Sequence, residues 1–112
     1  MPPDADDDLM FVGHMVDMAK RAQRLIAGRT RPDLETNDEF QLALVRALQV
    51  IGEAAWRISS TFQQAHPNLP WQQIAGFRHR VVHDYFAIDY DIVWRIASQE
   101  LQPLIDELSK SD

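Results

Sequence analysis

The sequence contains no cysteine and no apolar run long enough to cross a membrane. The absence of thiols excludes disulfide bonds, thiolate metal ligands and a cysteine nucleophile. The first ten residues, MPPDADDDLM, are acidic where a secretory signal would be basic. We therefore expect a cytoplasmic protein with no membrane segment. A length of 112 residues predicts a single domain over 1–112, in which the acidic residues 1–8 form a disordered N-terminal tail.

Basic residues are also few, since 11 lysines and arginines stand against 17 acids and leave a net charge of -6. This balance argues against general, salt-driven binding to nucleic acid. The exception is KRAQRLIAGRTR at 20–31, which holds five basic residues and no acid. This segment fits either a solvated helix face or a patch that steers a phosphate chain.

The hydrophobic spacing is helical, and no strand pattern competes with it. Apolar positions predict a helix over 9–27 that stops at Gly28. A second helix is predicted from Thr36 to about residue 63, with Thr36 as its N-cap and Glu39 completing a capping box. Gly52 within this helix is costly, which indicates close packing against a neighbour.

Three further helices are predicted in the second half of the chain. Pro70 opens a short one, Gly76 separates it from a helix over 77–84, and Asp89 caps the last. Pro103 should kink that last helix because it lacks an N–H donor. The predicted fold class is all-α: an antiparallel four-helix bundle with one short extra helix.

One stretch, FRHRVVHDYF at 77–86, concentrates arginine, histidine and tyrosine. If it is helical, His79 and His83 stack at i and i+4 and could begin a metal site, although no pattern supplies further ligands. Histidines that simply pack beside core valines are the structural alternative. In a third interpretation the stretch cleaves a phosphodiester. His83 would move a proton near neutral pH, and Arg78 would hold the phosphate with its fork of donors.

The arrangement R-x-x-x-x-H arises by chance roughly 0.3 times in such a chain, and requiring Tyr85 as well lowers this to roughly 0.006. The motif RHRVVHDY resembles the R-x-x-x-x-H-x-Y motif of HepT-like HEPN ribonucleases, the toxins of HepT–MntA toxin–antitoxin pairs. Two longer segments are also similar to that family, ALQVIGEAAWRIS at 47–59 and PWQQIAGFRHRVVHDYFAIDYDIVW at 70–94.

The resemblance implies a homodimeric, metal-independent endoribonuclease that needs no cofactor, with Arg78 and His83 as the pair that cleaves RNA. It implies that Tyr85 is the residue to which a MntA-like nucleotidyltransferase antitoxin attaches AMP. It also implies a dimer cleft lined by both copies of the motif helix, toward which residues 20–31 could steer RNA. Glu53, in the matching GEA segment, is expected to be a buried hydrogen-bond partner.

Two basic neighbours, His79 and Arg80, are assigned supporting roles. The family usually has asparagine or aspartate where His79 stands, so the histidine adds a titratable cation. Trp56, Trp71 and Trp94 could stack on bases, but their apolar neighbours favour core packing. Two other functions stay open. One is a noncatalytic nucleotide-binding or interaction module that pairs with a nucleotidyltransferase, and the other is an all-α dimer whose histidines only pack.

Overall fold

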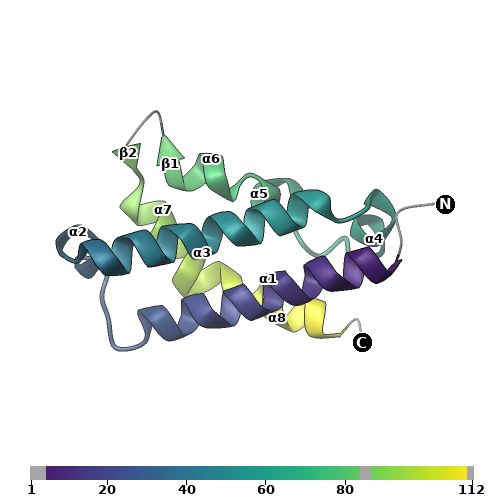
Figure 1. The fold of residues 1–112 in the computed structure, drawn as a ribbon, viewed down its shortest axis with the longest axis horizontal. Helices are drawn as coiled ribbons and strands as arrows, with labels where there is room; N and C mark the ends of the chain where they lie inside the picture. The colour runs from purple at the N-terminus through teal and green to yellow at the C-terminus, as the bar shows by residue number, and fades with distance from the viewer. Residues whose placement is uncertain (1–4, 84–86, 111–112) are drawn as a thin grey trace.

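The computed structural model describes residues 5–83 and 87–110, most of which are helical (Figure 1). In chain order the elements are α1 (Ala5–Ile26), α2 (Asp33–Thr36), α3 (Asp38–Arg57), α4 (Ser60–Ala65), α5 (Trp71–Ala75), α6 (Phe77–Val81), β1 (Val82–His83), β2 (Ala87–Ile88), α7 (Tyr90–Arg95), the π-helical turn η1 (Ile96–Glu100) and α8 (Leu101–Ser109). The predicted all-α class is confirmed. One feature was not expected, a short antiparallel ribbon in which β1 pairs with β2.

Two long helices, α1 and α3, run antiparallel through the molecule (Figure 1). The short helices α5 and α6 pack along α3, and α8 packs against α1. The four-helix bundle with one short extra helix is not confirmed in that form, because the motif helix predicted over 77–84 is only the five-residue α6 and the described residues contain the further short helices α2 and α4. Within the described residues, no helix is both long enough and apolar enough to span a lipid bilayer.

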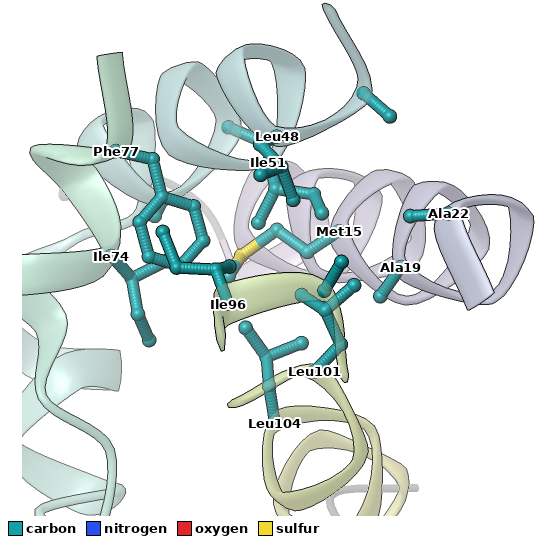
Figure 2. Packing of buried hydrophobic residues seen from close by; sticks show 14 of the residues in the cluster. Met15, Ala19, Ala22, Leu48, Ile51, Ile74, Phe77, Ile96, Leu101 and Leu104 are labelled. Carbon is teal, nitrogen blue, oxygen red and sulfur yellow. The ribbon is translucent and has the colours of Figure 1, made fainter. Parts of the chain in front are cut away.

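The core lies where α1, α3, α6 and the C-terminal helices meet. Figure 2 shows Met15 of α1 reaching toward Phe77 of α6 and Ile96 of η1, and all three side chains are buried. A buried aromatic side chain stabilises its segment through the apolar area it removes from water. Phe77 therefore anchors α6 to the body of the protein, and the orientation of its neighbour Arg78 follows from that anchor.

Gly52 confirms the predicted close packing. A Cβ atom built on it would lie 3.0 Å from the carbonyl oxygen of Ile74 and 3.3 Å from the Cβ of Phe77. No larger residue fits without a shift of the α5–α6 backbone. The glycine thus sets how closely α5 and α6 approach α3.

The first helix begins earlier than predicted. Because α1 starts at Ala5, residues 5–8 are helical, and their assignment to a disordered tail was wrong. Asp8 is buried, and its carboxylate accepts hydrogen bonds from the backbone N–H and the hydroxyl of Ser59, at 2.8 and 2.6 Å. Asp8 thereby holds the start of α4 in place, because the Ser59 hydroxyl that it binds also caps that helix.

The second long helix differs from the prediction at both ends. Its N-cap is Asn37, whose side chain accepts a hydrogen bond from the Phe40 N–H, and not Thr36, which belongs to α2. The helix ends at Arg57 and not near residue 63, because Ile58 adopts an extended conformation. The chain then continues as α4 in a separate helical turn.

Other predicted boundaries are confirmed. Gly76 lies between α5 and α6, and Asp89 caps α7 by accepting a hydrogen bond from the Ile92 N–H. The irregularity expected at Pro103 takes the form of the π-helical turn η1, which immediately precedes α8. Since a proline cannot donate to the carbonyl four residues earlier, a departure from α-helical bonding at this point is physically reasonable.

Candidate active site

The motif helix is shorter than predicted, and its length decides where the motif residues lie. Helix α6 ends at Val81, and Val82 is already extended with φ -127° and ψ 115°. Two consecutive β-branched residues favour such a change from helix to strand. The Val81 carbonyl accepts a hydrogen bond from the Asp89 N–H at 2.9 Å, which ties the end of α6 to the start of α7.

His83 consequently belongs to β1 and not to the motif helix. The metal-site interpretation required His79 and His83 to lie at i and i+4 of one helix, and the backbone does not have this geometry because α6 ends at Val81. In the parts of the chain that the structure describes, no three histidine, aspartate or glutamate residues form a group that could hold a metal ion.

Arg78 and His79 open onto a surface pocket of about 270 Å³. The residues that line this pocket, called here the α3–α6 pocket, are Gly52, Glu53, Trp56, Arg57, Ala75, Arg78 and His79. Three residues that the sequence singled out, Arg78, His79 and Glu53, are thus brought together from two helices.

Arg78 is exposed and unpaired within residues 5–83 and 87–110, where its guanidinium forms no hydrogen bond or ion pair. All its donors therefore remain available to a ligand. A planar guanidinium matches the oxygens of a phosphate, and a cleft with excess positive charge attracts anions. Because Arg57 and His79 line the same pocket with only one acid, Glu53, the α3–α6 pocket is suited to an anionic group.

Arg80, two residues along, has a different environment. Its Nη1 and Nη2 atoms donate to the two carboxylate oxygens of Glu100, each at 3.1 Å, and its guanidinium lies 5.5 Å from the centre of the Phe77 ring. The structure does not bring Arg80 into the α3–α6 pocket. Its positive charge is used to hold α6 against η1.

Glu53 lies in the pocket but is not buried. About half of its side chain is exposed, and Oε1 accepts a long hydrogen bond of 3.4 Å from Arg46 Nη1. The expectation of a buried hydrogen-bond partner was therefore wrong for the single chain. Tyr85, the predicted modification site, lies outside the described residues.

The three tryptophans differ in their surroundings. Trp71 is buried and donates its indole N–H to the carbonyl of His66 at 2.9 Å, and Trp94 is half-buried. Trp56, however, is 74% exposed, so the prediction of core packing was wrong there. The helical period did not decide this, because Trp56 lies about 200° around the axis from the buried Ala54 but only about 40° from the buried Gly52.

Several basic residues of segment 20–31 interact with other side chains of the same chain. Arg21 pairs with Asp17, and the Arg29 guanidinium lies 4.5 Å from the centre of the Phe40 ring. Arg31 binds Glu35 and Asp91, and the hydrogen bonds to these two carboxylates raise the pKa of its guanidinium.

A groove between α1 and α3 retains some of the basic character of this segment. Its volume is about 460 Å³, and its lining includes Arg21, Arg24 and Arg46 above apolar side chains of α1 and α3. Arg46 also reaches Glu53, so the groove and the α3–α6 pocket follow one another along α3.

Comparison with known proteins identifies relatives of most of the chain. A family model described as "Ribonuclease HepT-like" matches residues 15–111. A candidate RNase from Methanocaldococcus jannaschii is 36% identical over 72 residues, which cover 64% of this chain and 66% of the relative. A candidate ribonuclease HepT from Thermococcus cleftensis is 32% identical, over 70% of this chain and 71% of the relative. A candidate RNase from Caldanaerobacter subterraneus is 29% identical, and 84% of each chain is covered. No solved structure matches.

Proposed function

Because this chain belongs to the HepT-like ribonuclease family, we propose that it is a cytoplasmic endoribonuclease that cleaves RNA with Arg78 and His83 and without a metal ion. The observation that carries the proposal is the state of Arg78, which lies in the α3–α6 pocket with no carboxylate partner among the described residues. Arg80, by contrast, is held by Glu100. Of these two arginines, Arg78 alone has its guanidinium free for a phosphate.

The proposed reaction uses the nucleophile that RNA itself carries. The ribose 2′-oxygen attacks the adjacent phosphorus, the O2′–P bond forms, and the P–O5′ bond breaks. His83 takes the 2′-hydroxyl proton and delivers a proton to the leaving 5′-oxygen, so the products are a 2′,3′-cyclic phosphate and a 5′-hydroxyl. Arg78 stabilises the extra negative charge on the phosphorane with its N–H donors.

Cleavage of a fluorescently labelled RNA by variant proteins tests these roles. We expect activity to survive EDTA. Arg78→Ala should lower the rate about 10²–10³-fold through lost charge stabilisation, and His83→Ala about 10²–10⁴-fold through the lost proton shuttle. Both variants should retain the helical circular dichroism of the wild type. Arg95→Ala, which removes an exposed arginine of α7, is the matched control and should cleave normally.

Three results would contradict this mechanism. If EDTA abolished cleavage and Mg²⁺ restored it, the reaction would need a metal ion, which the proposal does not include. If His83→Ala retained wild-type activity, another residue would have to move the proton. His79, which lines the α3–α6 pocket, would be the first candidate. RNA binding without cleavage by the wild type would favour the noncatalytic nucleotide-binding module.

We further propose that the protein works as a homodimer whose two motif segments line one cleft. The pocket that holds Arg78 has a volume of about 270 Å³ in a single chain, below the usual range of about 300–1,000 Å³ for ligand sites, whereas an RNA strand needs a longer track. Light scattering at micromolar concentration should give twice the chain mass of 12.9 kDa. If the measured mass equalled that of one chain at all concentrations, the proposal of a shared cleft would be wrong.

The last part of the proposal concerns control by a partner. We propose that the protein is the toxin of a toxin–antitoxin pair, and that a MntA-like nucleotidyltransferase uses ATP to attach AMP to the Tyr85 hydroxyl, releasing pyrophosphate. Tyr85 follows His83 by two residues, so an added phosphate would compete with RNA for Arg78 and repel the incoming chain. Incubation with the nucleotidyltransferase and ATP should add AMP to the peptide that contains Tyr85 and abolish cleavage. Full neutralisation of Tyr85→Phe by the partner would favour simple steric capping instead.

A further inference from the structure

The exposed indole of Trp56 has no role in the reaction described above. We propose that Trp56 is the base-stacking platform for the nucleotide next to the phosphate that Arg78 holds. The inference rests on the proposed ribonuclease function and deepens it, because it assigns a residue that positions the substrate. Trp56 is 74% exposed and lines the α3–α6 pocket together with Arg78.

Among the described residues, Trp56 has none of the contacts that give Trp71 a structural role. Trp71 is buried, donates its indole N–H to a carbonyl oxygen, and packs its ring edge-on against Phe62. Within the described part of the chain, Trp56 has neither a hydrogen bond nor a ring contact. Leaving so large an apolar surface in water is unfavourable, which favours a ligand that covers it.

The neighbours of Trp56 indicate which ligand this is. Arg57 and Arg78 supply positive charge in the same pocket, and His79 adds an imidazole ring. A nucleotide presents a flat aromatic base and an anionic phosphate within one unit, and therefore matches both features of the pocket. Base stacking on an aromatic side chain beside basic residues is the usual way in which proteins bind single strands.

A second copy of this chain fits the same surface less well. In a two-fold symmetric dimer, a contact centred on this pocket would bring Arg57 and Arg78 close to the same residues of the copy. Like charges that face each other across an interface repel and disfavour the contact. RNA between the two copies would neutralise these charges, so the pocket is better explained as part of an open cleft than as a sealed contact.

Stacking on Trp56 also predicts a preference for single strands. The bases of a duplex are already stacked and paired, whereas those of a loop or a single strand can turn outward onto a side chain. The chain should therefore bind an unpaired strand more tightly than the same strand in a duplex.

Binding of an uncleavable strand tests the assignment independently of catalysis. The probe is a short 2′-O-methyl oligoribonucleotide, in which the attacking hydroxyl is blocked, with a matched strand that carries abasic sites. Affinity and tryptophan fluorescence are measured for the wild type, Trp56→Ala and Trp56→Phe. Leu42→Ala is the matched control, because Leu42 is a second exposed apolar residue of α3, 65% exposed, and does not line the pocket.

We expect Trp56→Ala to weaken binding of the intact strand about tenfold, within the range that one stacked base contributes, while Trp56→Phe recovers part of the loss. Leu42→Ala should bind like the wild type. The intact strand should quench the fluorescence of the wild type, and the abasic strand should not. RNA cleavage by the wild type with unchanged binding in Trp56→Ala would overturn the inference and leave the ribonuclease function standing.

Two further outcomes separate the alternatives. Base-dependent quenching and tight binding by a protein that never cleaves unmodified RNA would overturn the ribonuclease function and preserve the stacking role. A fall to the mass of one chain in Trp56→Ala, with the wild type and Leu42→Ala remaining dimeric, would show that Trp56 contacts a second copy, and this result would overturn the stacking role.

Discussion

The two sides of α6, a helix of five residues, have different roles. On the inner side, Phe77 and Val81 are buried, and Arg80 is held by Glu100. On the outer side, Arg78 and His79 are exposed and line the α3–α6 pocket. Arg78 and Arg80 have the same chemistry and stand two residues apart, yet of the two only Arg80 has a carboxylate partner among the described residues. Position relative to the core, and not residue type, decides which arginine serves structure and which can serve a ligand.

The strongest test of this division is to remove the inner anchor. Phe77→Ala should lower the free energy of unfolding by about 3–5 kcal/mol, because it removes a large buried side chain and leaves a cavity beside Met15 and Ile96. Urea denaturation followed by circular dichroism measures the change. His79→Ala on the outer side is the control and should stay within about 0.5 kcal/mol of the wild type. Equal losses in both variants would contradict the division.

The two arginines allow a sharper test, because the expected losses fall on different properties. Arg80→Ala should cost about 1–2 kcal/mol of stability, since it leaves the half-buried Glu100 without its bidentate partner. Cleavage by the folded protein should fall much less than in Arg78→Ala. Arg78→Ala should leave the urea midpoint almost unchanged, because its side chain is exposed and unpaired among the described residues.

The reverse pattern would assign the two roles the other way round. If Arg80→Ala abolished cleavage at full stability, Arg80 would be the residue that contacts phosphate. A Glu100→Gln variant separates the cases, because it weakens the ion pair and retains both arginines. It should lower stability and leave cleavage nearly unchanged.

The helices themselves were largely predictable, since apolar positions repeat with the helical period in α1, α3 and α8. Gly76 and Asp89 were assigned correctly because a glycine or an aspartate at the end of a periodic segment has a direct backbone role. Asn37 was missed as the cap of α3 because the adjacent Thr36 fits the same capping pattern. Local preferences of this kind cannot separate neighbouring candidates.

The parts that could not be predicted depend on contacts between distant segments. The burial of Asp8 depends on Ser59, and the pairing of Arg80 depends on Glu100, and neither partner is close in sequence. The change from α6 to β1 depends on the pairing of Val82 with Ile88 across the ribbon. The helical wheel did not decide the exposure of Trp56, because buried residues of α3 lie both near it and far from it around the axis. The motif supplied Arg78, and only the fold brought Trp56 and Glu53 beside it.

The smallest expected effect on stability comes from Gly52, the glycine of α3 that lies against Phe77 of α6. Gly52→Ala gains about 1 kcal/mol of helix propensity but brings its methyl group within 3.0 Å of the Ile74 carbonyl oxygen. Overpacking of this kind usually costs about 1–3 kcal/mol, so a net loss of about 1 kcal/mol is expected. Gly13→Ala in α1 is the matched control, because nothing lies within 4 Å of its new methyl group and only the gain of about 1 kcal/mol remains.

The two glycine variants should therefore shift the urea midpoint in opposite directions. Gly52 also lines the α3–α6 pocket, so the shift of α5 and α6 that accommodates the methyl group would move Arg78 relative to α3. Small displacements of a positioning group lower rates more than they lower stability. Gly52→Ala should consequently lose more cleavage activity than its unfolding free energy accounts for, while Gly13→Ala loses none. If both variants gained stability and kept full activity, the close approach of α3 and α6 would not be what holds Arg78 in position.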